Sequence, residues 1–187
     1  GKKPMASAEA TQTMVNRRYY GGSGPGIGGS AHLTYGVTVK PKFSPLVYNP
    51  PIRLFADAVV DVNAPSLTGR AEALAKVELR PNFDTGSQQA YFLYKRATNP
   101  RSSGSESRRW SLTVPATGGS VAVNLTARAN VSGYTWNGVG STSESSANAV
   151  ADPVFSFDQE GFDLAMAEAG LESFLLEDFY EITYSQG

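Results

Sequence analysis

Four carboxylates lie within a short stretch near the end of the chain: Asp152, Asp158, Glu160 and Asp163. Calcium takes about six to eight oxygen ligands without a fixed geometry, and the end loops of a β-sandwich can supply them. The spacing matches no EF-hand loop, and solvated turns and helix caps are the commoner use of such residues. The first expectation is therefore no cofactor, with calcium at these four residues as the alternative.

Aromatic side chains are the other candidates for a binding site. Trp136 directly precedes Asn137-Gly138, a pair that favours a tight hairpin turn. An indole at the tip of a hairpin can stack on a sugar ring or on another protein. Packing in the core is the alternative for each ring. The predicted ligand-binding residues are Tyr134, Trp136, Asn137 and Trp110, and Tyr91 and Tyr94 are further aromatic candidates.

Catalytic chemistry finds little support in the residue types present. The chain has no cysteine and only one histidine, His32, which excludes thiolate catalysis and multi-histidine metal sites. No Gly-x-Ser-x-Gly motif accompanies His32. We therefore expect a protein that is not an enzyme. A glycoside hydrolase with two carboxylates would have to draw on Asp57, Asp61, Asp152 and Asp158.

Charge is distributed unevenly along the chain. Residues 1–150 contain all 16 basic residues and 8 acidic ones, whereas residues 151–187, the acidic tail, contain 9 acidic residues and no lysine or arginine. The acidic tail can pack beside basic strands of its own domain, or it can attract the basic part of another copy. Since the basic residues are dispersed and the acidic tail would repel phosphate, we expect no nucleic-acid partner.

The elements that position these residues are predicted to be strands. Apolar and polar side chains alternate over residues 30–39, 52–62 and 68–79, the period of a half-buried strand. Asn137-Gly138 predicts a hairpin between residues 134–136 and 143–151. The polar segment 101–109 is predicted to be a loop. Further strand-like segments are 89–97, 110–116, 120–130, 153–158 and 174–184.

These patterns predict an all-β chain: a two-sheet antiparallel β-sandwich, similar to a jelly roll. Residues 161–170 predict one short helix that ends at Gly170. Residues 1–29, which are rich in glycine toward their end, predict a flexible arm, so residues 30–187 form the single sandwich domain. No apolar run is long enough for a membrane span.

The segment SSANAVADPVFSFD and the closing FYEITYS resemble the C-terminal part of exported bacterial surface proteins of the PEP-CTERM (exosortase-sorted) class. The matching positions are Ala151-Asp152-Pro153, Phe155, Phe157-Asp158 and Tyr184-Ser185. The chain departs from the family pattern in the helix predicted between these strands, and the PEP tripeptide is absent. The resemblance implies an extracellular or cell-surface protein of a bacterium that makes exopolysaccharide or biofilm matrix. It implies no catalytic residues.

Three functions remain open at this point. The first is a non-enzymatic extracellular β-sandwich that binds polysaccharide or other surface proteins, or acts as a biofilm-matrix module. The second is a self-assembling fibre or shell subunit, in which the basic part of one copy meets the acidic tail of the next. The third, less favoured, is a carbohydrate-active enzyme.

Overall fold

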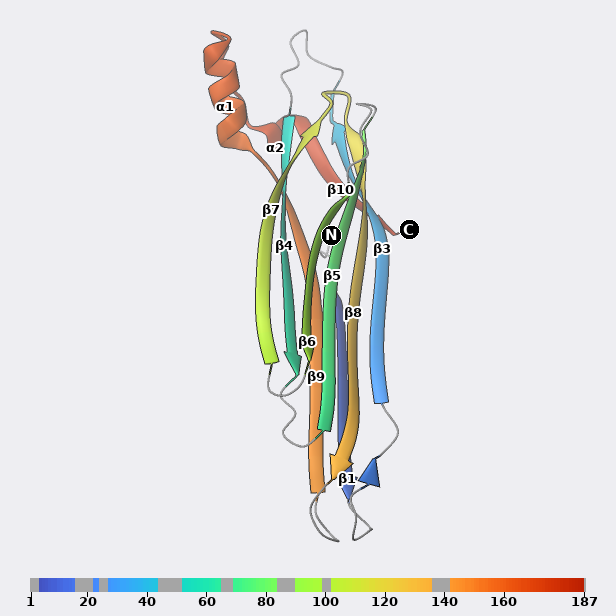
Figure 1. Cartoon of the computed structure of the whole chain (residues 1–187). Helices are drawn as coiled ribbons and strands as arrows, with labels where there is room; N and C mark the ends of the chain where they lie inside the picture. The colour runs from blue at the N-terminus through green and yellow to red at the C-terminus, as the bar shows by residue number, and fades with distance from the viewer. Residues whose placement is uncertain are drawn as a thin grey trace.

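The computed structural model describes residues 4–15, 22–23, 27–43, 52–64, 69–83, 90–98, 102–135 and 142–186. Two antiparallel sheets face each other, which confirms the predicted β-sandwich (Figure 1). The first sheet has the order β1-β9-β4-β7, and the second has the order β10-β3-β8-β5-β6 with β2 paired to β8. The strands are β1 (Ala6–Val15), β2 (Gly22–Ser23), β3 (Ile27–Pro41), β4 (Ile52–Ala64), β5 (Gly69–Asn82), β6 (Tyr91–Thr98), β7 (Ser102–Val114), β8 (Gly119–Thr135), β9 (Thr142–Phe157) and β10 (Tyr180–Gln186).

The predicted alternation decides which side chains fill the space between the sheets. In β4 every second residue from Ile52 to Ala64 is buried, and the residues between them face outward or are only partly covered. β5 and β8 contribute their inward residues in the same way, for example Val77 and Leu125. Because successive strand side chains point to opposite faces, one face of each sheet becomes core and the other meets solvent.

The predicted loop at 101–109 is wrong, because Ser102–Arg109 is the first half of β7 and pairs with β4 from Asp57 to Ala64. β7 is an edge strand of the first sheet. Edge strands are commonly polar and charged, which prevents pairing with other chains. The polar composition of this segment is therefore compatible with a strand, although it hides the apolar alternation.

The predicted N-terminal arm is also wrong for residues 6–15. They form β1, which pairs along its length with β9, and Ala6 is buried. β1 passes so close over β3 that a Cβ on Gly29 would lie 2.6 Å from the Glu9 carbonyl oxygen. The glycines of the predicted arm thus belong partly to a tightly packed strand, since β3 begins at Ile27.

The predicted hairpin pairing between residues 134–136 and 143–151 is wrong as well, and Asn137-Gly138 itself lies outside the described residues. β8 pairs with β3 and β5 in the second sheet, whereas β9 pairs with β1 and β4 in the first. β8 and β9 therefore belong to different sheets. An Asn-Gly pair favours a tight turn locally. The sheet to which each flanking strand belongs depends on its pairing with strands distant in the sequence, namely β3 and β5 for β8 and β1 and β4 for β9.

The predicted helix is confirmed as α1 (Gln159–Glu168), with Phe162 and Met166 buried. A second helix, α2 (Leu176–Phe179), was not predicted. It occupies the first part of the predicted last strand, so β10 begins at Tyr180 rather than at residue 174. The Phe174 ring packs 4.8 Å from the Phe162 ring and 4.1 Å from the Phe179 ring. This aromatic packing explains the apolar residues that suggested a strand. No helix among the described residues is long and apolar enough to cross a membrane.

Candidate functional site

Of the four predicted ligand-binding residues, Trp110 lies in the core, and the side chains of the other three are outside the described part of the structure. Trp110 is 6% exposed and packs in the core, with its ring 6.1 Å from that of Tyr91. It is therefore not available as a ligand-stacking surface. Trp136 and Asn137 lie outside the described residues, and Tyr134 is described only by its backbone in β8, opposite Ser23.

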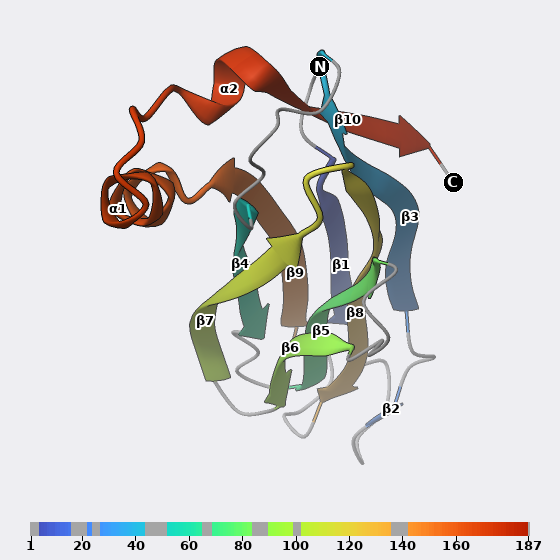
Figure 2. The same cartoon turned by 90° about the horizontal axis from the view of Figure 1, so that it is seen from above.

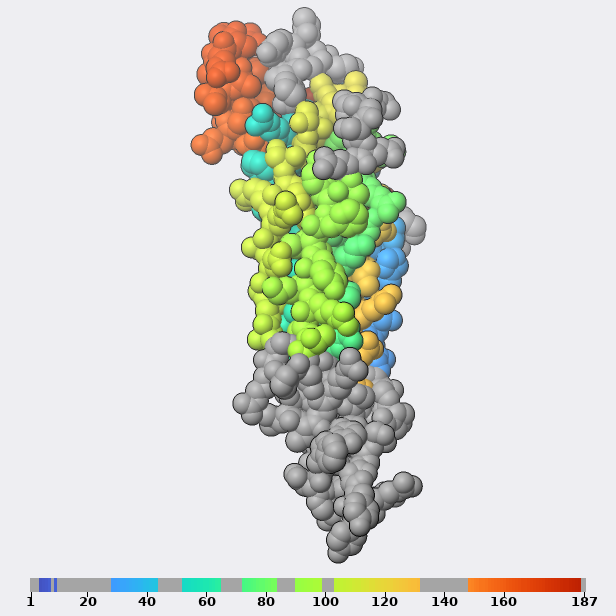
Figure 3. Space-filling model, viewed as in Figure 1, coloured from blue at the N-terminus to red at the C-terminus, as the bar shows by residue number. Residues whose placement is uncertain are grey.

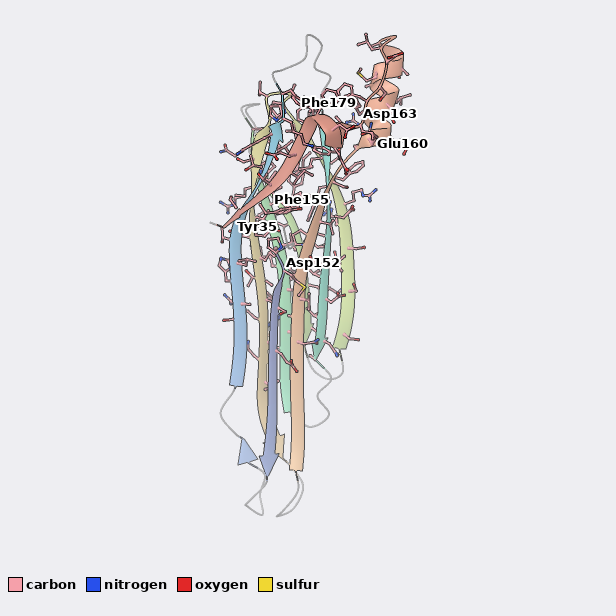
Figure 4. The ribbon with its side chains drawn as sticks, turned by 180° about the vertical axis from the view of Figure 1, so that it is seen from behind. Tyr35, Asp152, Phe155, Glu160, Asp163 and Phe179 are labelled. Carbon is pink, nitrogen blue, oxygen red and sulfur yellow. The ribbon has the colours of Figure 1, made fainter. Side chains whose placement is uncertain are left out.

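The four predicted calcium ligands do not come together. The Asp158 carboxylate caps α1 by accepting a hydrogen bond from the Gly161 backbone N–H at 2.9 Å. Asp163 accepts hydrogen bonds from Ser173 and Gln159, which lower its pKa. Figure 4 shows Asp152 on β9, well away from Glu160 and Asp163 on α1. Over the described ranges, no three acidic or histidine side chains form a group that could hold a metal ion.

We expect millimolar calcium to leave the melting temperature unchanged relative to EDTA, because Asp158 and Asp163 already have hydrogen-bond partners within the chain. Differential scanning calorimetry with calcium, magnesium and EDTA measures this. A rise with calcium that magnesium does not reproduce would show a site that binds the folded state.

Two of the candidate catalytic carboxylates, Asp57 and Asp158, have structural partners. Arg109 donates to both carboxylate oxygens of Asp57, at 2.6 and 2.9 Å, and its guanidinium lies 4.8 Å from the centre of the Phe55 ring. This bidentate pair lies across the two neighbouring strands β4 and β7. Asp61 is exposed farther along β4. Asp57 is thus held as half of an ion pair on the outer surface of the first sheet.

The outer surface of the second sheet carries a more promising arrangement. Phe92 and Tyr94, alternate residues of the edge strand β6, are 47% and 49% exposed. On the neighbouring β5, Glu78 lies opposite Phe92 and Lys76 lies opposite Tyr94. The Lys76 ammonium is 5.1 Å from the centre of the Phe92 ring, a cation–π contact. Figure 3 shows this part of the molecule, where β6 in green lies beside β7 in yellow-green.

Two rows of side chains continue this surface across four strands. One row runs Thr34, Asn124, Glu78, Phe92, and the next runs His32, Thr126, Lys76, Tyr94. With strands about 4.8 Å apart, each row spans about 14 Å, and the rows lie about 7 Å apart along the strands. We call these eight residues, together with Arg80, the aromatic face.

The half of the aromatic face on β3 and β8 is polar and partly pre-ordered. The Thr34 hydroxyl donates to the Asn124 side-chain oxygen at 2.9 Å, and the His32 imidazole lies 3.2 Å from the Thr126 hydroxyl. These contacts set the side chains in place along the two rows. The result is a flat strip with aromatic rings at one end and hydroxyl, amide and imidazole groups at the other.

Positive charge dominates the exposed part of the aromatic face. Glu78 is only 7% exposed and receives hydrogen bonds from Lys76 at 2.8 Å and Arg80 at 2.5 Å. The bond from Lys76, followed by that from Arg80, lowers the pKa of Glu78 although burial opposes the shift. The carboxylate thus lies beneath its two cations, whose side chains reach solvent.

Glu78→Gln should lower the free energy of unfolding at pH 7 by about 1–3 kcal/mol, because two charge-assisted hydrogen bonds lose their acceptor charge. The folded-state pKa of Glu78 is lowered, so its stabilisation is present at neutral pH and is lost as the pH falls through that pKa. The difference between wild type and variant should therefore shrink toward roughly pH 3. Urea unfolding at both pH values measures it.

Glu72→Gln is the matched control for this prediction, because Glu72 on the same strand bonds a single cation among the described residues, Arg96 at 2.7 Å, and is more exposed. Its loss should cost about 0–1 kcal/mol. Equal losses from both variants, or a Glu78 effect that persists at low pH, would contradict the role given to Glu78.

Tyr94 was among the aromatic candidates predicted from the sequence, whereas Phe92 was not. The signal was present, because Leu93 and Ala97 are the buried residues of β6 and the residues between them must face the opposite side. Two large aromatic residues on the solvent face of an edge strand are therefore readable from the alternation alone.

Comparison with known protein families finds no family model that matches the chain, and a search of curated proteins finds no significant match.

Proposed function

We propose that this protein is a non-enzymatic, polysaccharide-binding β-sandwich of a bacterial cell surface or extracellular matrix, and that the aromatic face binds an anionic polysaccharide. The observation that carries the proposal is the pair of half-exposed rings, Phe92 and Tyr94, beside Lys76, whose carboxylate partner Glu78 is buried. Location outside the cell is supported by the resemblance of residues 145–158 to exported bacterial surface proteins.

The chemistry of the aromatic face fits a sugar chain. Exposed aromatic rings offer flat apolar surfaces on which the C–H face of a pyranose ring can stack. Thr34, Asn124, Thr126 and His32 extend the same surface with groups that can donate and accept hydrogen bonds to sugar hydroxyls. A flat strip of this kind suits an extended polymer that lies across the strands, rather than a small molecule enclosed in a cavity.

The positive charge of the aromatic face favours anionic polysaccharides over neutral ones. Lys76 and Arg80 present positive charge while Glu78 is covered, and Arg128 lies exposed on the neighbouring β8. Carboxylates of a uronic acid polymer would be drawn to these cations, and salt would weaken the attraction. A neutral polymer gains only the stacking and hydrogen-bonding part. We therefore assign the ligand to the class of carboxylated polysaccharides.

Affinity electrophoresis tests this proposal with polygalacturonate and its fully methyl-esterified form, which has the same backbone without charge. We expect strong retardation by polygalacturonate and weaker retardation by the ester. Isothermal titration calorimetry should show that affinity for polygalacturonate falls as salt rises from about 0.02 to 0.3 M. Binding to neither polymer would remove the proposed function, and equal binding to both would remove the charge preference.

A further inference from the structure

The C-terminal part of the chain forms a second surface with unusual chemistry. α1 stands outside the sandwich beside β4, and α2 leads from it back to β10 (Figures 1 and 2). Leu164 on α1 is 63% exposed and Leu175, just before α2, is 61% exposed; Leu171 is also exposed. We call residues 158–181 the acidic knob.

The acidic knob carries negative charge that no salt bridge among the described residues neutralises. It contains eight carboxylates and no lysine or arginine. Within the described ranges, none of these carboxylates forms a salt bridge, since the ion pairs of the structure lie at Asp57, Glu72, Glu78 and Glu106. Lys42 does reach the acidic knob, but its ammonium donates to the backbone carbonyl of Glu177. Exposed leucines among carboxylates that form no salt bridge favour a partner that is both apolar and cationic.

The aromatic face offers the complementary chemistry on the same chain. It exposes Phe92 and Tyr94 beside Lys76 and Arg80. The acidic knob of one molecule does not cover its own aromatic face, because the two rings remain half exposed, and Figure 2 shows α1 on the side of β4 and β9, away from β5 and β6. Contact between the two surfaces therefore requires two molecules.

We infer that the acidic knob of one copy docks on the aromatic face of a second copy. The contact joins two different surfaces, so each bound copy still offers one free surface of each kind. Such a head-to-tail contact produces open chains rather than closed dimers. It does not depend on polysaccharide binding, although an anionic polysaccharide would compete for the same aromatic face.

Light scattering coupled to size-exclusion chromatography tests the inference on the full chain. We expect wild-type protein at about 0.02 M salt to form oligomers that grow with concentration, and to dissociate toward monomers at about 0.5 M salt. Leu164→Ser/Leu175→Ser removes the apolar part of the acidic knob, and Phe92→Ser/Tyr94→Ser removes that of the aromatic face. Each double variant alone should be monomeric.

An equimolar mixture of the two double variants is the decisive sample. One variant keeps its aromatic face and the other keeps its acidic knob, so the mixture should form a heterodimer and nothing larger.

The control variant is Val59→Ser/Val154→Ser, which removes two exposed apolar side chains from the outer surface of the first sheet. It should associate as wild type does. If a double variant fails to fold by circular dichroism, a charge variant replaces it. For the acidic knob this is Glu160→Gln/Glu168→Gln. For the aromatic face it is Arg96→Gln/Arg128→Gln, since these two arginines lie opposite Leu74 in the row next to Lys76 and Tyr94.

A wild-type protein that is monomeric at low salt would overturn the inference. A mixture that stays monomeric, or either double variant that still forms oligomers, would overturn the head-to-tail contact. The leucine variant should bind polygalacturonate at least as tightly as wild type, because its acidic knob no longer competes for the aromatic face. Loss of self-association and loss of polysaccharide binding are therefore separate results.

Discussion

Replacing both Phe92 and Tyr94 with alanine should weaken the binding of polygalacturonate by about 30- to 700-fold. Truncating an aromatic ring that contacts a ligand reduces the binding free energy by about 1–2 kcal/mol, so removing two rings reduces it by about 2–4 kcal/mol. Both rings are half exposed in the free protein, and their removal leaves no cavity in the core. The melting temperature should therefore change little, and calorimetric titration measures the loss of affinity.

Phe43→Ala is the matched control for the double variant. Phe43 is an exposed aromatic residue beyond the end of β3, and its ring packs against that of Phe179 rather than on the aromatic face. Its replacement should leave the affinity for polygalacturonate within twofold of wild type. If the control and the double variant lose affinity equally, the aromatic face is not where the polymer binds.

Replacing Trp110 with alanine should have the largest effect on stability. The indole is buried between the sheets, opposite Ala56 on β4 and against the Tyr91 ring. Truncation of a buried tryptophan costs about 3–5 kcal/mol, because transfer energy is lost and a cavity remains. In a chain of this size that loss lowers the melting temperature by about 6–20 °C. Thermal unfolding followed by circular dichroism measures it.

Two further substitutions give the Trp110 result its meaning. Trp110→Phe keeps much of the buried volume and should cost clearly less than alanine. Val154→Ala, at an exposed position of β9, should change stability by no more than about 0.5 kcal/mol. A Trp110→Ala protein with wild-type stability would show that the indole does not pack between the sheets.

The strands with one apolar face were predictable because their two faces differ. β4 and β5 show this most clearly, since their inward residues are apolar and the register that buries them is the one observed. α1 was predictable for a similar reason, because Phe162 and Met166 recur at helical spacing and Gly170 follows with a φ of 69°. Local pattern and burial agree in these elements.

The elements that were missed depend on partners far away in the sequence. β1 is a strand because β9, more than a hundred residues later, supplies its hydrogen bonds. The first half of β7 is polar because it lies at a sheet edge. β8 and β9 belong to different sheets because β8 pairs with β5 and β9 pairs with β4. The turn residues between them do not predict these partners. Such long-range choices cannot be read from alternation alone.

The candidate site was only partly predictable for the same reason. The alternation in β6 identifies Phe92 and Tyr94 as outward residues, but only the register places Glu78 and Lys76 opposite them. Likewise, Asn124 and Thr34 share a row because β8 pairs with both β5 and β3. The acidic residues of the tail were visible in the sequence, whereas their use as a helix cap and in hydrogen bonds required the structure.

The most direct test of the proposed function is an amide chemical-shift titration of labelled protein with a short oligomer of galacturonic acid. The largest changes should fall on the two rows of the aromatic face, at Phe92, Tyr94, Lys76, Glu78, Asn124 and Thr126, and should saturate together. Changes confined to other surfaces, or no saturable change at any concentration up to the solubility of the oligomer, would contradict polysaccharide binding by the aromatic face.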